Sequence, residues 1–162
     1  EMNIFYLDED PAVAAGMMCD KHVVKMILES AQMLCTAHRI LDGDQYANEA
    51  RLYKKGFVDH PSTVWTRASR YNYEWLWNHM AALLTEYTNR YGKVHATERL
   101  VDPLWVHPGN ISEDESFSPP PQCMPDQYKC DDTVQAYRNY YLGEKMYMAK
   151  WDYTEAPSWA IA

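Results

Sequence analysis

The run DKHVVKMILESAQMLCTAHRIL, residues 20–41, is the feature that most limits how this chain can fold. Its apolar residues recur at the three- and four-residue intervals of an α-helix. At about 100° per residue, five polar side chains fall within a wedge of about 80°: His22, Lys25, Glu29, Gln32 and Thr36. A helix on a protein surface usually exposes a wider polar face. The pattern therefore predicts a long, largely buried helix with one narrow polar stripe.

Other helical patterns predict an all-α, compact fold made of a single helical domain over residues 1–162. Asp10 and Pro11 have the sequence of a helix cap and first turn, and Asp20 is the expected cap of the long helix. Further helices are expected at about 45–55, 62–91 and 131–151, with Gly92 ending the second of these. The 20–41 and 62–91 helices should pack against each other, since both carry long apolar faces.

The segment from about residue 101 to 130 contains most of the nine prolines, including Pro119-Pro120-Pro121. Proline cannot donate a backbone hydrogen bond and disrupts helix interiors. This segment is expected to lack regular structure, as a long Pro-rich loop that is either an ordered wrap or mobile.

The net charge of −8 is unevenly distributed, with +4 in residues 51–100 between two stretches of −6. Broad, non-specific DNA binding normally needs an extended cationic surface, which this chain lacks. A local basic patch interleaved with aromatic rings remains available: its members are Arg51, Lys54, Lys55, Arg67, Arg70, Arg90, Lys93 and Arg99, with Trp65, Tyr71, Tyr73, Trp75 and Trp77 between them. The alternative interpretation is a solvated basic face beside ordinary core aromatics.

The polar stripe also has two interpretations. Lys25 and Glu29 could form an ordinary pair on a solvated face, or the stripe could line a functional cavity where Glu29 acts as general acid or base with His22 beside it. Metal binding by His22, Glu29, His38 and His60 would be a third chemistry. No HExxH motif is present and Lys25 would repel a cation, so we expect no metal and no cofactor.

Five stretches carry a resemblance to known families: MNIFYLDEDP, CDKHVVKMILESAQMLCTAHRILDG, HPSTVWTRASRYNYEWLWNH, EYTNRYGKVHAT and PPPQCMPDQYK. They resemble a family of small phage and viral proteins. More distantly, the layout is similar to the pyrimidine-dimer DNA glycosylases of the phage endonuclease V type. In those proteins an Asp-x-His on the first long helix precedes the catalytic Glu by seven residues, as do Asp20-Lys21-His22 and Glu29 here. His60, Trp65, Pro157 and Trp159 also have counterparts in that family.

The resemblance implies an enzyme that cuts the glycosidic bond of a damaged or modified pyrimidine and then cleaves the strand through a Schiff base on the N-terminal amine. That family exposes a small N-terminal residue and has arginines near the Glu, whereas this chain begins Glu1-Met2-Asn3 and has Leu28 and Gln32 there. The alternative function is a non-catalytic nucleotide- or host-protein-binding module, such as a viral inhibitor or sponge.

The expected partner is DNA or a nucleotide. No apolar run approaches the roughly 18 residues of a membrane span, so we expect no membrane partner and a location in the host cell cytoplasm. The four cysteines are expected to be free thiols. The candidate catalytic residues are Glu29 and His22, and the candidate substrate-binding residues are Lys25, Gln32, Trp65, Arg67, Arg70, Tyr73 and Trp75.

Overall fold

A computed structural model describes residues 2–161, and within this range the chain is all-α, as predicted. The helices are α1 (Pro11–Met17), α2 (Asp20–Asp42), α3 (Gln45–Glu49), α4 (Pro61–Ala68), α5 (Arg70–Tyr91), α6 (Val101–Trp105) and α7 (Thr133–Tyr140). Short 3₁₀ turns cover Ala96–Leu100, Asp126–Tyr128 and Ser158–Ala160. None of the helices in residues 2–161 has the length and apolar character of a membrane span.

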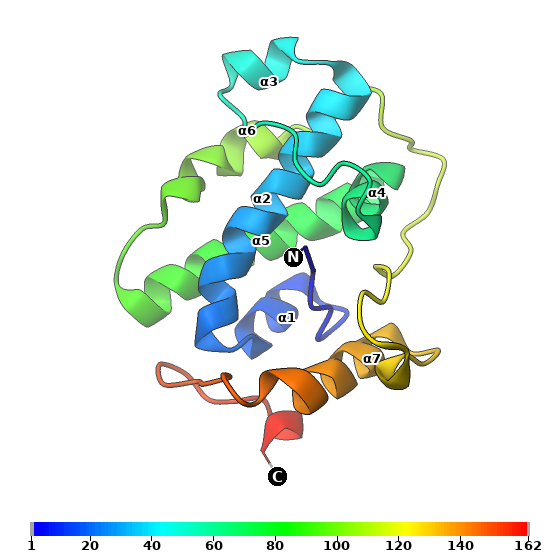
Figure 1. Ribbon diagram of the computed structural model, residues 1–162. Coiled ribbons are helices and arrows are strands. Elements are labelled where there is room, and N and C mark those ends of the chain that lie inside the picture. The colour runs from blue at the N-terminus through cyan, green and yellow to red at the C-terminus, as the bar shows by residue number, and fades with distance from the viewer. Residues whose placement is uncertain (1, 162) are drawn as a thin grey trace.

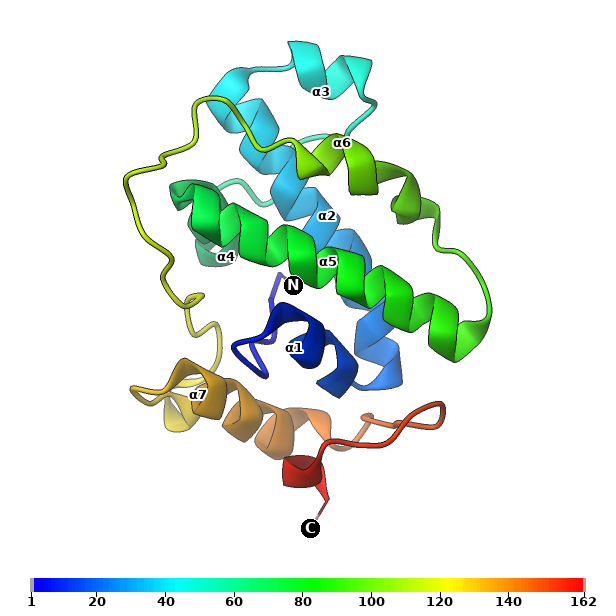
Figure 2. The ribbon, with the colours of Figure 1, turned by 180° about the vertical axis from the view of Figure 1, so that it is seen from behind.

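Helix α2 runs through the centre of the molecule and crosses α5, with α1 and α4 also packed against this pair (Figure 1). The expected packing of the two longest helical segments is therefore confirmed. The N-terminal strip, residues 2–7, enters the middle of the fold beside α2 (Figures 1 and 2). Met2, Ile4, Phe5 and Leu7 are all at most 2% exposed, so this strip belongs to the core.

The predicted 62–91 helix is wrong in one respect, because Ser69 divides it into α4 and α5. Ser69 has an extended backbone (φ −153°, ψ 143°), and its hydroxyl accepts hydrogen bonds from the backbone N–H groups of Tyr71 and Asn72. A serine that caps the following helix in this way ends the preceding one. The far end agrees with the prediction, since Gly92 closes α5 in the left-handed conformation at φ 68°.

Several helix ends also differ from those expected. Helix α3 stops at Glu49, and Arg51 follows with a positive φ of 56°. Asp10 caps α1 as predicted, but Asp20 does not cap α2, because Cys19 is the cap residue and its side chain makes no capping hydrogen bond. Asp132 caps α7, which passes into a π-helical turn at Tyr141–Lys145 and ends well before residue 151.

The Pro-rich segment is mainly an ordered wrap, although it begins with the short helix α6, which the sequence did not predict. It runs past α4 from one end of the molecule to the other (Figures 1 and 2). Ser118 fixes its middle: its carbonyl accepts a hydrogen bond from Trp65 Nε1 at 2.8 Å, and its N–H donates to Asn72 Oδ1 at 3.1 Å. The four cysteines are free, as expected.

Candidate active site

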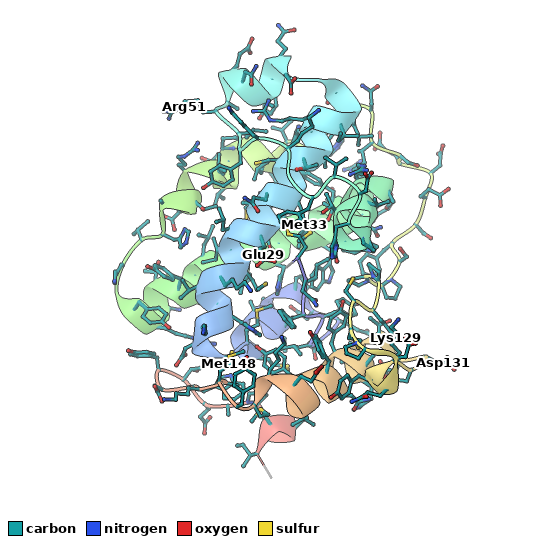
Figure 3. The ribbon with its side chains drawn as sticks, in the orientation of Figure 1. Glu29, Met33, Arg51, Lys129, Asp131 and Met148 are labelled. Carbon is teal, nitrogen blue, oxygen red and sulfur yellow. The ribbon has the colours of Figure 1, made fainter. Side chains whose placement is uncertain are left out.

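Glu29 lies halfway along α2 on a face covered by the N-terminal strip (Figure 3). The residue is 8% exposed. Its Oε1 accepts a hydrogen bond from the backbone N–H of Asn3 at 3.3 Å, and its Oε2 is 3.9 Å from Lys25 Nζ. The nearly buried carboxylate of Glu29 is therefore held between the backbone N–H of Asn3 and the ammonium group of Lys25.

Asn3 folds the N-terminal strip against this carboxylate. Its Oδ1 accepts hydrogen bonds from the N–H groups of Ile4 at 2.7 Å and Phe5 at 3.0 Å, which turns the chain so that Phe5 has φ 55°. Its Nδ2 donates to the carbonyl of Cys123 in the Pro-rich segment at 3.1 Å. The backbone nitrogen of Asn3 is thus positioned from both sides rather than by Glu29 alone.

His22 is packed beside the same strip. Its ring stacks on Phe5 with 4.4 Å between ring centroids, and its Nδ1 shares a 2.6 Å hydrogen bond with the Tyr141 hydroxyl. Burial, reinforced by the positive charges of Lys145 and Lys25, lowers the pKa of His22 to about 3. The imidazole is therefore neutral near pH 7 and fixes the position of Phe5, two residues after Asn3.

The polar stripe predicted on α2 is mostly buried, and only Lys25 is largely exposed to solvent. His22, Glu29 and Thr36 are buried, Gln32 is half-buried, and the Lys25 side chain is 53% exposed. The Thr36 hydroxyl exchanges hydrogen bonds with the backbone of Gly56. The stripe thus faces the N-terminal strip and the loop before α4, and it reaches solvent mainly at Lys25.

The aromatic residues proposed to stack a base lie in the core. Trp65, Tyr73 and Trp75 are 6%, 1% and 9% exposed. The indole N–H of Trp75 donates to the carbonyl of Glu9, and the hydroxyl of Tyr73 donates to the carbonyl of Leu104. A base could reach these rings only if the surrounding chain moved.

The two arginines proposed for phosphate contacts already have partners. Arg67 donates to the carbonyl of Val58 at 2.9 Å, and Arg70 pairs with Glu74 at 3.0 Å and Glu113 at 2.5 Å. Several lysines nearer to α2 have no carboxylate within ion-pair distance among the described residues. These are Lys21, Lys145 and Lys150 around the start of α2, and Lys54 and Lys55 in the loop that contacts Thr36.

Sequence reasoning proposed Glu29, His22 and Lys25 but not Asn3, Phe5 and Tyr141, which the structure places beside them. These three come from the two ends of the chain, and only the folded arrangement brings them to α2. The hydrophobic run NIFYL gave the one local sign, since so apolar a segment had to be buried somewhere. Among residues 2–161, no group of three or more histidine, cysteine or acidic side chains is placed to hold a metal ion.

Comparison with known proteins gives one match. Residues 2–99 match the family described as pyrimidine dimer DNA glycosylase, a range that contains the N-terminal strip and helices α1 to α5. No curated protein and no solved structure matches the chain. The matched range covers more than half of the sequence and includes Asn3, His22, Lys25 and Glu29. The chain belongs to the pyrimidine dimer DNA glycosylase family.

Proposed function

We propose that this protein is a DNA N-glycosylase that removes damaged or modified pyrimidines, with Glu29 as its key carboxylate. The observation that supports this most directly is the 3.3 Å contact between Glu29 Oε1 and the backbone nitrogen of Asn3. The family resemblance assigns this chemistry to a carboxylate and the N-terminal amine, and the Asn3 nitrogen lies near the beginning of the chain.

Glycosidic cleavage breaks the bond between C1′ of the sugar and the base nitrogen, and the electron pair leaves with the base. Positive charge then develops on the sugar, and a fixed carboxylate in a site of low water content stabilises it strongly. Glu29 is 8% exposed and held by the Asn3 N–H and the Lys25 ammonium, so it requires little reorganisation. Lys25, 3.9 Å away, is positioned to hold a neighbouring phosphate.

The state of the Asn3 nitrogen decides whether strand cleavage follows. As a peptide nitrogen its lone pair is delocalised into the carbonyl, so it is not a nucleophile. Water would then attack C1′, and the product would be an abasic site. A chain that starts at Asn3 would place a free α-amine beside Glu29, where it could form a Schiff base and support strand cleavage.

The remaining candidate residues take graded roles in this proposal. His22 positions Phe5 and the N-terminal strip rather than touching substrate. Lys25 and Gln32 are the α2 side chains nearest to where a sugar–phosphate would lie. Arg67, Arg70, Trp65, Tyr73 and Trp75 would contribute to DNA contact only if the strand or the loop moves, because each is already engaged within the fold.

The decisive experiment compares Glu29→Gln with the parent on duplex DNA that contains a cyclobutane pyrimidine dimer, with base release as the readout. Removing the charge should lower turnover about 10²-fold or more while changing the free energy of unfolding by about 1 kcal/mol or less. Glu74→Gln is the matched control, since Glu74 is a half-buried carboxylate paired with Arg70 on α5.

Borohydride trapping on abasic DNA separates the two versions of the mechanism. A chain in which Met2 precedes Asn3 should give no covalent adduct, and a chain that begins at Asn3 should give one that Glu29→Gln reduces. If the parent binds DNA or nucleotides without any turnover, the binding-module alternative replaces the enzyme. The net charge of −8 would suit a module that binds a host protein.

A further inference from the structure

A groove of about 950 Å³ lies beside the first turns of α2. Lys21, Val24 and Lys25 line it from α2, and the far wall comes from the segment between residues 147 and 153, including Tyr147 and Tyr153. This segment lies outside the residues matched by the family, so the groove combines a family helix with a part of the chain that the match does not cover.

Hydrogen bonds to the start of α2 hold the far wall in place. The carbonyl of Lys150 accepts from Asp20 N–H at 2.8 Å, and Asp20 Oδ2 accepts from Asp152 N–H at 2.8 Å. Trp151 Nε1 donates to the carbonyl of Met17 at 3.0 Å. Figure 1 shows this segment passing below the beginning of α2, and Figure 3 places Met148 at the same level. The groove is therefore built into the fold.

Two exposed tyrosine rings stand at this wall. Tyr147 is 87% exposed and Tyr153 is 58% exposed, and the Tyr153 ring lies 4.9 Å from that of Tyr91. Exposed aromatic rings beside a groove are the surfaces on which unpaired bases stack, whatever their sequence. Paired bases inside a duplex do not offer their faces in this way.

Three ammonium groups accompany the rings, from Lys21, Lys25 and Lys150. The groove also contains two carboxylates. That of Asp20 is occupied by Arg90 at 3.0 Å and by Asp152 N–H. Of the two acidic residues that line the groove, Asp152 is therefore the one whose carboxylate has no ion pair among the described residues. The groove thus has a net positive lining in a chain whose overall charge is −8.

We propose that this groove binds an unpaired DNA strand next to Glu29, with bases stacked on Tyr147 and Tyr153 and phosphates held by Lys21, Lys25 and Lys150. The identification of the ligand as DNA rests on the proposed function. Lys25 lines the groove and its Nζ is 3.9 Å from Glu29 Oε2, so a strand held by Lys25 would lie close to the carboxylate. The protein should therefore prefer damaged bases in single-stranded or locally opened DNA over the same bases in closed duplex.

The test measures fluorescence anisotropy with a labelled oligothymidine of about 12 nucleotides, a length that single-strand grooves accommodate, and with the matching duplex. The single strand should bind more tightly. The Tyr147→Ala/Tyr153→Ala double variant should weaken single-strand binding about tenfold or more, since stacking contributes substantially for each base. Tyr147→Phe keeps the ring and should bind within about twofold of the parent. Tyr46→Ala, which removes a 37% exposed tyrosine from α3, is the matched control.

Salt dependence tests the lysines separately. Three phosphate contacts to a single strand predict a slope of about −2 for log K against log salt, and Lys150→Gln should reduce its magnitude by about 0.7. Equal affinity for duplex and single strand, or tyrosine variants that bind like the parent, would overturn the proposal. Competition by thymidine monophosphate as strong as that by the oligonucleotide would also overturn it, in favour of a free-nucleotide site.

The Glu29→Gln variant separates this proposal from the proposed function. It should bind the single strand like the parent while losing turnover. A parent without turnover that still binds through the tyrosines would refute the glycosylase and support the groove. If the parent has turnover on closed duplex and the tyrosine changes do not affect it, the result would support the glycosylase and refute the groove.

Discussion

A buried arginine binds near each end of α2, but the two arginines differ in how far their partners lie from them in the sequence. Arg90, with a side chain 1% exposed, comes from α5 and binds the carbonyls of Gly16 and Met18 and the carboxylate of Asp20. Arg39, with a side chain 8% exposed, lies in the last turns of α2 and binds the carbonyls of Leu52 and Tyr53. The Arg90 contacts span 70 to 74 residues, and the Arg39 contacts span 14 at most.

This difference separates the first half of α2, which carries the candidate site, from the last turns, where Arg39 binds nearby residues. Around the start of α2, the partners of Asp20, His22 and Glu29 come from α5, from residues 141–152 and from the N-terminal strip. Around its end, Arg39 binds the chain that follows within a few residues. The geometry of the site therefore depends on distant parts of the chain. At the other end, Arg39 binds residues close in sequence, although Asp42 also accepts hydrogen bonds from the N–H groups of Gly109 and Asn110.

The largest effect is expected when the long-range arginine is removed. Arg90→Met leaves buried carbonyls and the Asp20 carboxylate without their donor, so the free energy of unfolding should fall by about 3–5 kcal/mol. Arg39→Met should cost less, about 1–3 kcal/mol, because its partner Asp44 is 58% exposed and can be solvated again. Urea unfolding of both variants measures the difference, and equal losses would show that the two ends are held equally.

A smaller effect is expected from two tyrosine hydroxyls that serve the two halves of α2. Tyr141 binds His22 and the backbone N–H of Cys19, and Tyr73 binds His38 and the carbonyl of Leu104. Tyr141→Phe and Tyr73→Phe should each cost about 1–2 kcal/mol of stability, since each leaves buried polar groups without a partner.

The two variants should differ in turnover, because only Tyr141 supports the histidine that packs on Phe5 beside Asn3. Base release by Tyr141→Phe should therefore fall, and that by Tyr73→Phe should stay at the parent level when both are assayed well below their melting temperatures. Equal losses of activity would mean that the Tyr141 contact with His22 matters no more for base release than the Tyr73 contact with His38.

The same contrast explains what the sequence could and could not predict. The periodicity of residues 20–41, the Asp10 cap and the stop at Gly92 are local signals, and each appears in the fold where it was expected. Ser69 was also a local signal, but the continuous apolar pattern on both sides of it concealed the break. Glu29 was proposed because a carboxylate on a mainly apolar helix is conspicuous.

The other parts of the site depend on contacts between distant residues, which periodicity does not encode. The separations are 26 residues for Asn3 and Glu29 and 119 for His22 and Tyr141. Trp65, Tyr73 and Trp75 show a related limit, because their apolar rings suit a core and a base-stacking surface equally well in sequence. The exposed rings, Tyr147 and Tyr153, were indistinguishable from them until the fold placed them.

The smallest expected effect compares the two buried histidines of α2 through pH. Burial lowers the pKa of His22 to about 3 and that of His38 to about 4, while both have ordinary values near 6.5 in the unfolded chain. The unfolded state therefore binds more protons below pH 6.5, and stability is complete above that pH and falls as the pH decreases toward 4. Each histidine should contribute a slope of up to about 1.4 kcal/mol per pH unit.

His22→Gln and His38→Gln should each remove one such contribution, so their free energies of unfolding between pH 6.5 and 5 should vary less steeply than that of the parent. His79, which is buried on α5 with its pKa lowered to about 4, remains in both variants and accounts for part of the residual slope. Urea unfolding at intervals of pH measures these slopes. An unchanged slope in His22→Gln would mean that His22 takes up its proton within the fold, which requires the contact with Phe5 and the N-terminal strip to open in acid.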